Sequence, residues 1–244
     1  MSVAYPAPVY RRAHWYVLAV AIPTLAGFLP TYFGLFPRMQ LAHHVHFWAA
    51  TLWLVLLFAQ PMLIARGNLS LHRTMGMVGI GVVIVFYATS MYVAWYSAGD
   101  AAAKGLPQQL LHWVDILAVN FALIAVVLAV VWRKTVAVHQ RLMLATLFAG
   151  IVPGVGRALG QFVLAPAGLP GAVFPIVIFG GMILAALAWA WADRFKHPVT
   201  LGVLATVLVL SVSTFTIGAS EWWREVLATF GIPQELYTPF RLDP

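Results

Sequence analysis

Seven long apolar runs, separated by short polar connections, dominate the pattern of residues along the chain. A helix needs about 20 mostly apolar residues to cross the hydrocarbon core of a membrane. That length predicts seven transmembrane helices at Trp15–Phe36, Leu41–Ala65, Thr74–Tyr96, Leu110–Trp132, Leu142–Leu164, Val173–Ala192 and Val199–Gly218. No stretch is left for a soluble domain, so we expect an all-α polytopic membrane protein whose residues 1–244 form a single bundle, with a four-helix core at 41–165.

The segment after the last span, residues 219–244, has a different pattern. Its first part begins with a polar residue and then spaces large apolar side chains as on one face of a helix: Trp222, Trp223, Val226, Leu227 and Phe230. A short amphipathic helix of this kind lies in the membrane interface. We therefore expect an interfacial segment and not an eighth span.

Composition agrees with a membrane protein, because 62% of the residues are hydrophobic and only 9% are charged. Cysteine is absent, which excludes disulfides, Cys-ligated zinc, iron–sulfur clusters and haem attached through cysteine. The net charge of +7 is not gathered on a soluble segment, so no nucleic acid is expected as a partner.

The positive charges indicate an orientation. Nine Lys and Arg residues lie on the side of the membrane where the first span begins: Arg11, Arg12, Arg66, Arg73, Arg133, Lys134, Arg141, Arg194 and Lys196. Four lie on the other side: Arg38, Lys104, Arg224 and Arg241. Since Lys and Arg are enriched in cytoplasmic loops, the N-terminus is predicted to be cytoplasmic. Seven crossings then put the C-terminus outside.

The histidines sort into two layers under this topology. The outer layer, at the starts of the second and fourth helices, contains His43, His44, His46 and His112. The inner layer contains His14, His72, His139 and His197. A histidine beside hydrocarbon is unfavourable unless something binds it. Both layers are therefore candidate ligand sites.

The spacing of four of these histidines suggests a repeat. His72 follows His46 by 26 residues, and His139 follows His112 by 27. Two such hairpins, folded together, are expected to bring His46 near His112 and His72 near His139. Opposing histidines on facing helices are what six-coordinate haem iron requires. The pattern thus favours a non-covalent haem b at one or both levels.

Other residues share faces with these histidines. His46, Trp53 and Gln60 recur every seven residues, and such a polar stripe normally faces the bundle interior. Arg157 lies 18 residues after His139, or about five turns, and is expected to meet Asp115 or an acidic group such as a haem propionate.

Glycines follow the histidines of the third and fifth spans on the same helical faces: Gly76, Gly79, Gly150 and Gly154. Small residues along a helix allow either a flat ring or a neighbouring helix to come close. Pro153, within the same stretch of the fifth span, is expected to kink that helix.

The stretches HFWAATLWLVLLFAQ and LHRTMG, within His46–Gly76, resemble a large bacterial family of uncharacterised membrane proteins. Those proteins carry a His, a downstream Gln and a His-Arg-x-Leu-Gly at the next helix start; Met75 stands here in place of that Leu. The resemblance implies a multi-pass protein of the bacterial inner membrane.

The four-histidine layout is similar to the transmembrane dihaem b cytochromes, which carry electrons from ascorbate or a similar donor. That resemblance implies an outer haem held by His46 and His112, and an inner haem held by His72 and His139. Arg157 would assist cofactor binding, and quinone or another small reductant would be the partner. Those cytochromes usually have six spans, whereas seven are predicted here.

Two alternatives stay open. His43 with His46, and His112 with Asp115, are each three residues apart, and imidazoles plus a carboxylate suit zinc, copper or iron. Such a site would indicate copper handling or a membrane-embedded hydrolase or oxygenase, so enzyme activity is an open question.

In the other alternative the histidines bridge lipid headgroups and water, and the glycines only pack helices. The protein would then be haem-free and structural, with lipid and other membrane subunits as partners. A retinal protein is disfavoured because the last helix carries no lysine. An ion pump is disfavoured because Asp115 and Arg157 are the only charged residues besides histidine predicted inside spans.

Overall fold

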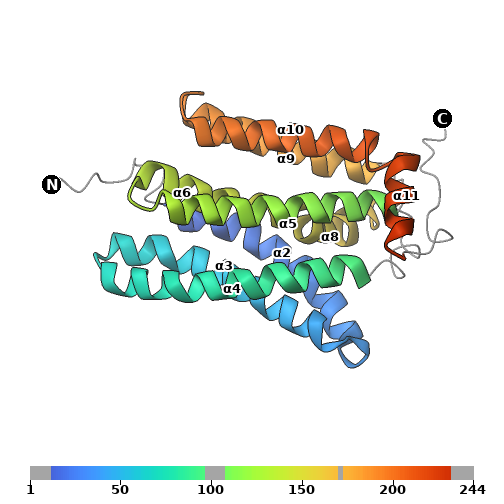
Figure 1. The fold of residues 1–244 in the computed structure, drawn as a ribbon, viewed down its shortest axis with the longest axis horizontal. Helices are drawn as coiled ribbons and strands as arrows, with labels where there is room; N and C mark the ends of the chain where they lie inside the picture. Colours follow the sequence, from blue (N-terminus) through green and yellow to red (C-terminus); the bar gives the residue numbers. More distant parts are fainter. Residues whose placement is uncertain (1–11, 97–107, 170–172, 232–244) are drawn as a thin grey trace.

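The computed structural model describes residues 12–96, 108–169 and 173–231. In these ranges, seven helices are long and apolar enough to cross a membrane, which confirms the predicted all-α, seven-span architecture. They lie side by side in one elongated bundle, and a short helix crosses its far end (Figure 1).

Five of the seven spans are single helices, and the first and fifth are composite. The helices in chain order are α2 (Ala13–Leu35), α3 (Leu41–Ala65), α4 (Leu69–Tyr96), α5 (Gln108–Val131), α6 (Val136–Ala145), α7 (Leu147–Gly150), α8 (Gly156–Leu159), α9 (Val173–Ala192), α10 (Pro198–Thr216) and α11 (Glu221–Thr229). A 3₁₀ turn, η1 (Phe36–Arg38), extends the first span. Two π-helical turns, η4 (Ile151–Val155) and η5 (Gly160–Leu164), interrupt the fifth.

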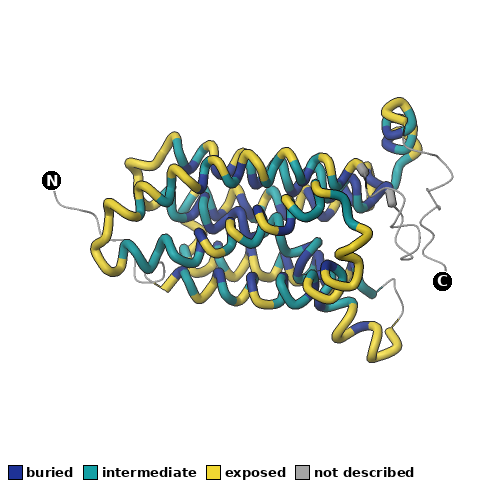
Figure 2. The backbone as a smooth tube through the Cα atoms, turned by 90° about the horizontal axis from the view of Figure 1, so that it is seen from below, coloured by how far each residue is buried: buried dark blue, intermediate teal, exposed yellow. Residues whose placement is uncertain are grey.

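The outside of the bundle is apolar along its length, as a lipid-facing surface requires. Large side chains on several spans are exposed from the protein: Ile22, Leu52, Met77, Ile176 and Val209, at 63%, 43%, 69%, 72% and 64%. Buried positions lie mainly on the inward faces of the helices (Figure 2). In water such a surface would be unfavourable, so its natural environment is hydrocarbon.

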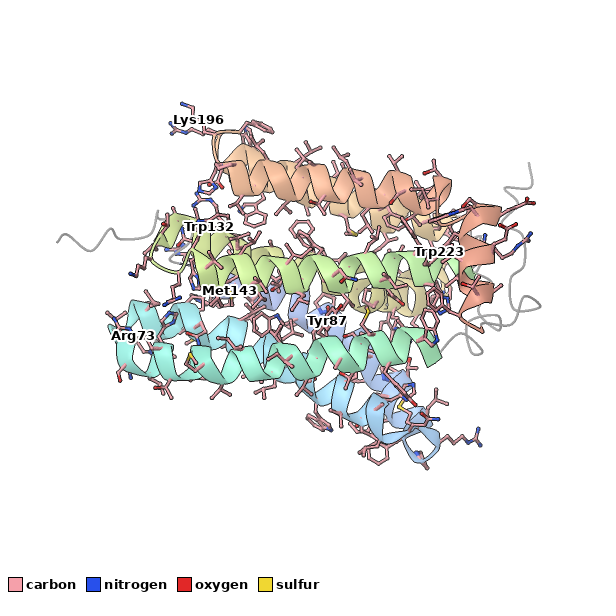
Figure 3. The ribbon with its side chains drawn as sticks, in the orientation of Figure 1. Arg73, Tyr87, Trp132, Met143, Lys196 and Trp223 are labelled. Atoms are coloured by element: carbon pink, nitrogen blue, oxygen red, sulfur yellow. The ribbon has the colours of Figure 1, made fainter. Side chains whose placement is uncertain are left out.

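The two ends of the bundle differ in charge. We call the end at which α2 begins the N-side and the end that carries α11 the C-side. Arg73, Trp132 and Lys196 lie at the N-side and Trp223 at the C-side, with Tyr87 about midway (Figure 3). The N-side is the end predicted from Lys and Arg counts to be cytoplasmic.

The helices that carry the predicted core pack in a ring. Extensive contacts join α3 with α4, α4 with α5, and α5 with the fifth span, and α2 closes the ring between the fifth span and α3. Residues from α2 through α7 form one buried cluster inside it: Ala13, Val17, Trp53, Leu57, Val83, Val126, Leu144 and Leu147. The first span therefore packs together with the four predicted core spans.

The first span can enter this ring because two glycines remove side chains at its contact with the fifth. A Cβ on Gly27 would lie 2.5 Å from the carbonyl oxygen of Gly154 and 2.6 Å from the backbone nitrogen of Ala158. A Cβ on Gly154 would in turn overlap the side chain of Thr24. Only glycine permits backbones to approach so closely.

The α9–α10 hairpin lies outside the ring, against α5 and the fifth span (Figure 1). Its buried residues join those of α5 and the fifth span in a second cluster, which includes Val114, Ala145, Met182 and Val207. A cavity of about 440 Å³ remains at this contact.

The amphipathic helix predicted after the last span is present as α11. Ser220 caps it by accepting a hydrogen bond from the backbone N–H of Trp223, and Trp223 and Leu227 are buried against the bundle. Trp222 and Phe230 are exposed, as expected for side chains at a membrane interface. The rest of the predicted interfacial segment, residues 232–244, lies outside the described residues.

Candidate functional site

The two histidines predicted to form the inner pair lie inside helices at the N-side. The third span begins at Leu69 and the fifth at Val136, several residues earlier than predicted. His72 and His139 are therefore each the fourth residue of their helices. The helices α4 and α6 both pack on α5, so the two histidines lie on either side of it.

The ring of His139 is held in a fixed orientation. Its Nδ1 lies 2.8 Å from the carbonyl oxygen of Ala129, near the end of α5. Since a carbonyl only accepts, Nδ1 carries the proton and donates it, and Nε2 is left with its lone pair. This is the tautomer in which an imidazole binds a metal, with a backbone carbonyl fixing the ring.

Polar atoms without hydrogen-bond partners gather at the same end of the bundle. His72 Nδ1, Gln60 Oε1 and His14 Nδ1 are all buried and lack a partner among the described residues. The amide nitrogen of Gln60 donates to the backbone oxygen of His72 at 3.3 Å, which joins α3 to α4 here. Buried polar atoms are normally satisfied, so these atoms indicate a site that is incomplete without a further group.

His46, on the C-side half of α3, is packed against α4. Its Nδ1 lies 3.3 Å from the hydroxyl of Ser90, and its ring stacks on Phe86 at 5.3 Å between centroids. The polar stripe predicted on α3 does face inward, because Trp53 donates to Thr146 of the fifth span at 3.3 Å.

His112, the other member of the predicted outer pair, is fully buried on α5. The next residue, Trp113, donates from its indole nitrogen to Ser213 of α10 at 2.9 Å and packs edge-on against Trp223 of α11. His46 lies on α3 and His112 on α5, and both of these helices pack on α4. The two histidines lie in the C-side half of the bundle.

The sequence predicted that Arg157 meets Asp115, but among the described residues the two side chains form no ion pair within 4.0 Å. The guanidinium of Arg157 lies over the ring of Phe28, 4.8 Å from its centroid. A cation on an aromatic face is favourable, but it leaves the five N–H donors without acceptors.

The π-helical turns that flank Arg157 are a feature that sequence reasoning missed. η4 ends directly before the four residues of α8, and η5 begins directly after them. Each π turn rotates the following residues relative to a regular helix, and such turns are frequent at functional sites. The available signal was Pro153, whose missing N–H and bulky ring disfavour a regular α-helical turn. The sequence analysis had expected only a kink there.

The glycines of the third and fifth spans differ in their surroundings. A Cβ on Gly79 would touch Trp53 and Leu56 of α3 at 3.7 Å, and one on Gly156 would touch Phe174 of α9 at 3.0 Å. A Cβ on Gly76 or Gly150 would meet nothing within 4 Å. Gly79 and Gly156 thus allow close helix packing, while Gly76 and Gly150 contact no other helix.

Arg141, counted from the sequence among the loop charges, is buried near the N-side in a bidentate ion pair. Two of its nitrogens lie 2.7 Å from the two carboxylate oxygens of Asp193, which follows α9. His197 caps α10 beside this pair by accepting from the N–H of Val199. Burial lowers the pKa of His197 from its usual 6.5, and the charge of Arg141 lowers it further, while Asp193 acts in the opposite direction.

A metal site built from protein ligands alone finds limited support. Across the described ranges, no group of three or more His, Asp or Glu side chains is positioned to hold a metal ion. The predicted ligands His43, His46, His112 and Asp115 do not form such a group.

No protein-family model, no curated protein and no solved structure matches the chain. The resemblances noted in the sequence therefore stay predictions, and the functional argument rests on the residues themselves.

Proposed function

We propose that the protein is a membrane electron-transfer protein resembling a b-type cytochrome, with non-covalent haem between histidines of the second to fifth spans. The observation that carries the proposal is at the N-side, where His72 and His139 each lie one turn inside helices that both pack on α5, with Nδ1 of His139 held by the carbonyl oxygen of Ala129. Two imidazoles on facing helices are a sufficient protein ligand set for six-coordinate haem iron.

The chemistry of this pair fits an axial ligand set. His139 has its Nδ1 proton committed to the carbonyl of Ala129, so its Nε2 is available to bind iron. His72 Nδ1 is buried and lacks a hydrogen-bond partner. A haem bound there would supply the one-electron redox chemistry, and the protein would set its potential through ligands and low polarity.

A second haem is proposed between His46 and His112, in the C-side half of the bundle. His46 is held by Ser90 and Phe86, and His112 is fully buried, so both rings have fixed surroundings. Two haems at different depths would let electrons cross the hydrocarbon layer in steps. The positive charges at the N-side favour a cytoplasmic position for the first pair and a multi-pass protein of the bacterial inner membrane.

The visible spectrum of the purified protein tests the proposal. We expect sharp b-type bands on reduction, and we expect His72→Ala or His139→Ala to reduce haem content by at least about half, since each removes one of two axial ligands. His197→Ala is the matched control, because His197 lies at the same end but caps α10 and should leave the bands unchanged. Protein that is colourless after expression with ample haem would overturn the proposal.

A further inference from the structure

We propose that the cavity between the α9–α10 hairpin and the ring of helices binds one acyl chain of an anionic phospholipid. The chain comes from the leaflet at the N-side, and the headgroup of the lipid lies at the basic residues of that end. This site is separate from the proposed haem ligands, all of which lie in the ring. Its length, its lining and the charges at its end each point to the same occupant.

The cavity has the length and the position of one leaflet. Its volume is about 440 Å³, and its lining on α5 runs from Leu117 to Leu128. On α10 the lining runs from Val199 to Leu210. Each stretch rises by roughly 16 Å along its helix, and one leaflet of a hydrocarbon core about 30 Å thick measures about 15 Å. Since α5 ends and α10 begins at the N-side, the cavity extends from the middle of the bundle to that end.

The cavity is open to the hydrocarbon around the protein. Ile124 of α5 and Val209 of α10 both line it, and they are 56% and 64% exposed. Gly202 of α10 also lines it and is exposed, and a Cβ there would meet nothing within 4 Å. A lipid chain can therefore reach the cavity directly from the bilayer.

The lining favours hydrocarbon over a polar ligand. Among the described lining residues, only Asn120 and Thr206 have side chains that form hydrogen bonds, and both are already engaged. The amide nitrogen of Asn120 donates to the carbonyl oxygen of Ile116 at 2.7 Å, and its amide oxygen accepts from the hydroxyl of Tyr87 at 3.2 Å. The hydroxyl of Thr206 donates to the carbonyl oxygen of Gly202 at 2.8 Å. Because water in a cavity needs two to four polar partners, an acyl chain is the occupant that fits.

Exposed basic residues lie next to the N-side end of the cavity. Lys196 is three residues before the first lining residue of α10, and Lys134 is six residues after the last lining residue of α5. The ion pair of Arg141 with Asp193 joins the two connections that carry these lysines. It also occupies the only carboxylate that the described residues place at the N-side, so the lysines keep an unbalanced positive charge. Basic residues between helices at this side of a membrane attract anionic headgroups.

The test is native mass spectrometry of the purified, delipidated protein, titrated with dioleoyl phosphatidylglycerol or dioleoyl phosphatidylcholine. The two lipids have the same chains and differ in the charge of the headgroup. We expect one molecule of the anionic lipid to bind with about ten-fold higher affinity than the zwitterionic lipid, because two lysines lie at the headgroup. The double variant Lys134→Gln with Lys196→Gln should remove this preference. The control Arg73→Gln should keep it, since Arg73 is exposed at the N-side on α4, which does not line the cavity.

Two variants test the cavity itself. Gly202→Leu and Thr206→Leu both place additional carbon atoms in it, so each should weaken the binding of both lipids at least about ten-fold through loss of chain burial. Gly181→Leu adds the same side chain on the exposed face of α9, outside the cavity, and should bind as the wild type does. Thermal midpoints at or above that of the wild type in lipid-free micelles show that the variants are folded, and the comparison of the two lipids on the wild type needs no variant.

One anionic lipid that binds the wild type and is lost when the cavity is filled supports the site. Equal affinity of the wild type for the two lipids, or unchanged binding in both Gly202→Leu and Thr206→Leu, overturns it. A dimer without retained lipid also overturns it, because a second copy of the chain would then cover the cavity. The lipid count is read for protein with and without haem alike, so the outcome is independent of the haem proposal.

Discussion

The ring of helices from α2 to α8 and the α9–α10 hairpin are both apolar, but they are packed in different ways. The ring contains His46, His72, His112, His139, Asp115 and Arg157, together with the glycine-mediated contact of Gly27 with Gly154. The hairpin borders a cavity of about 440 Å³ lined almost wholly by apolar side chains, including Phe121, Phe148 and Val207. In this protein the candidate ligands lie in the ring, and the cavity lies beside the hairpin.

The difference follows from what each region must hold. Polar groups inside a membrane need fixed partners, and close helix contacts keep these partners in place. An apolar helix contact does not need fixed polar partners. A cavity such as the one beside the hairpin can therefore remain between the helices. The hairpin is attached near its N-side connection by one strong polar contact, the ion pair between Arg141 and Asp193.

The largest effect is expected at that ion pair. Both side chains are buried, at 8% and 6% exposure, so Arg141→Met would leave the carboxylate of Asp193 buried and unpaired. Such a change typically costs about 3–5 kcal/mol. We expect this loss in the free energy of unfolding, measured by SDS titration in mixed micelles.

The double variant Arg141→Met with Asp193→Leu separates the cost of an unpaired buried carboxylate from the loss of the ion pair itself. It removes both charges, so most of the lost stability should return, because the remaining side chains are apolar. If the double variant is no more stable than Arg141→Met, the ion pair is not what attaches the hairpin.

A smaller effect is expected at the close contact within the ring. Gly27→Ala adds one methyl group where backbone atoms lie 2.5 and 2.6 Å away, and overpacking of this kind typically costs about 1–3 kcal/mol. Gly34→Ala on the same helix is the control, since its Cβ would meet nothing within 4 Å. Equal unfolding midpoints for the two variants in the same micelles would contradict the close contact.

The smallest effect is expected at the cavity, and it has the opposite sign. Gly202 lines the cavity, and its Cβ would meet nothing within 4 Å, so Gly202→Leu should fill space and stabilise by about 1 kcal/mol. Gly181→Leu, on the exposed face of α9, is the control for helix propensity alone. A Gly202→Leu variant that is less stable than Gly181→Leu would show that the hairpin already packs tightly.

The number of spans could be predicted because a spanning helix is a continuous run of about 20 apolar residues, and such a run is visible in the sequence without knowledge of tertiary contacts. The near-equal spacing of His46 to His72 and His112 to His139 did predict two hairpins of similar length, which place His72 and His139 one turn inside their helices. The pairing of these two histidines and the meeting of Asp115 with Arg157 stay predictions.

Other features depend on tertiary contacts and left no local signal. The pairing of Arg141 with Asp193 joins positions 52 residues apart, and Arg141 looked like an ordinary loop charge. The entry of α2 into the ring needed Gly27 and Gly154 to face each other, which no single helix reveals. Pro153 lies inside the first π turn, so the sequence indicated a distortion there without its type, and the second π turn left no such signal.

The central claim is that His72 and His139 bind one iron between them. The electron paramagnetic resonance spectrum of the oxidised, purified protein tests it most directly, because two imidazole ligands give haem iron a low-spin signal. We expect that signal in the wild type and in His197→Ala, and its loss or conversion to high spin for one haem in His139→Ala. A protein without a haem signal, or a wild-type signal that survives intact in both His72→Ala and His139→Ala, would contradict the account.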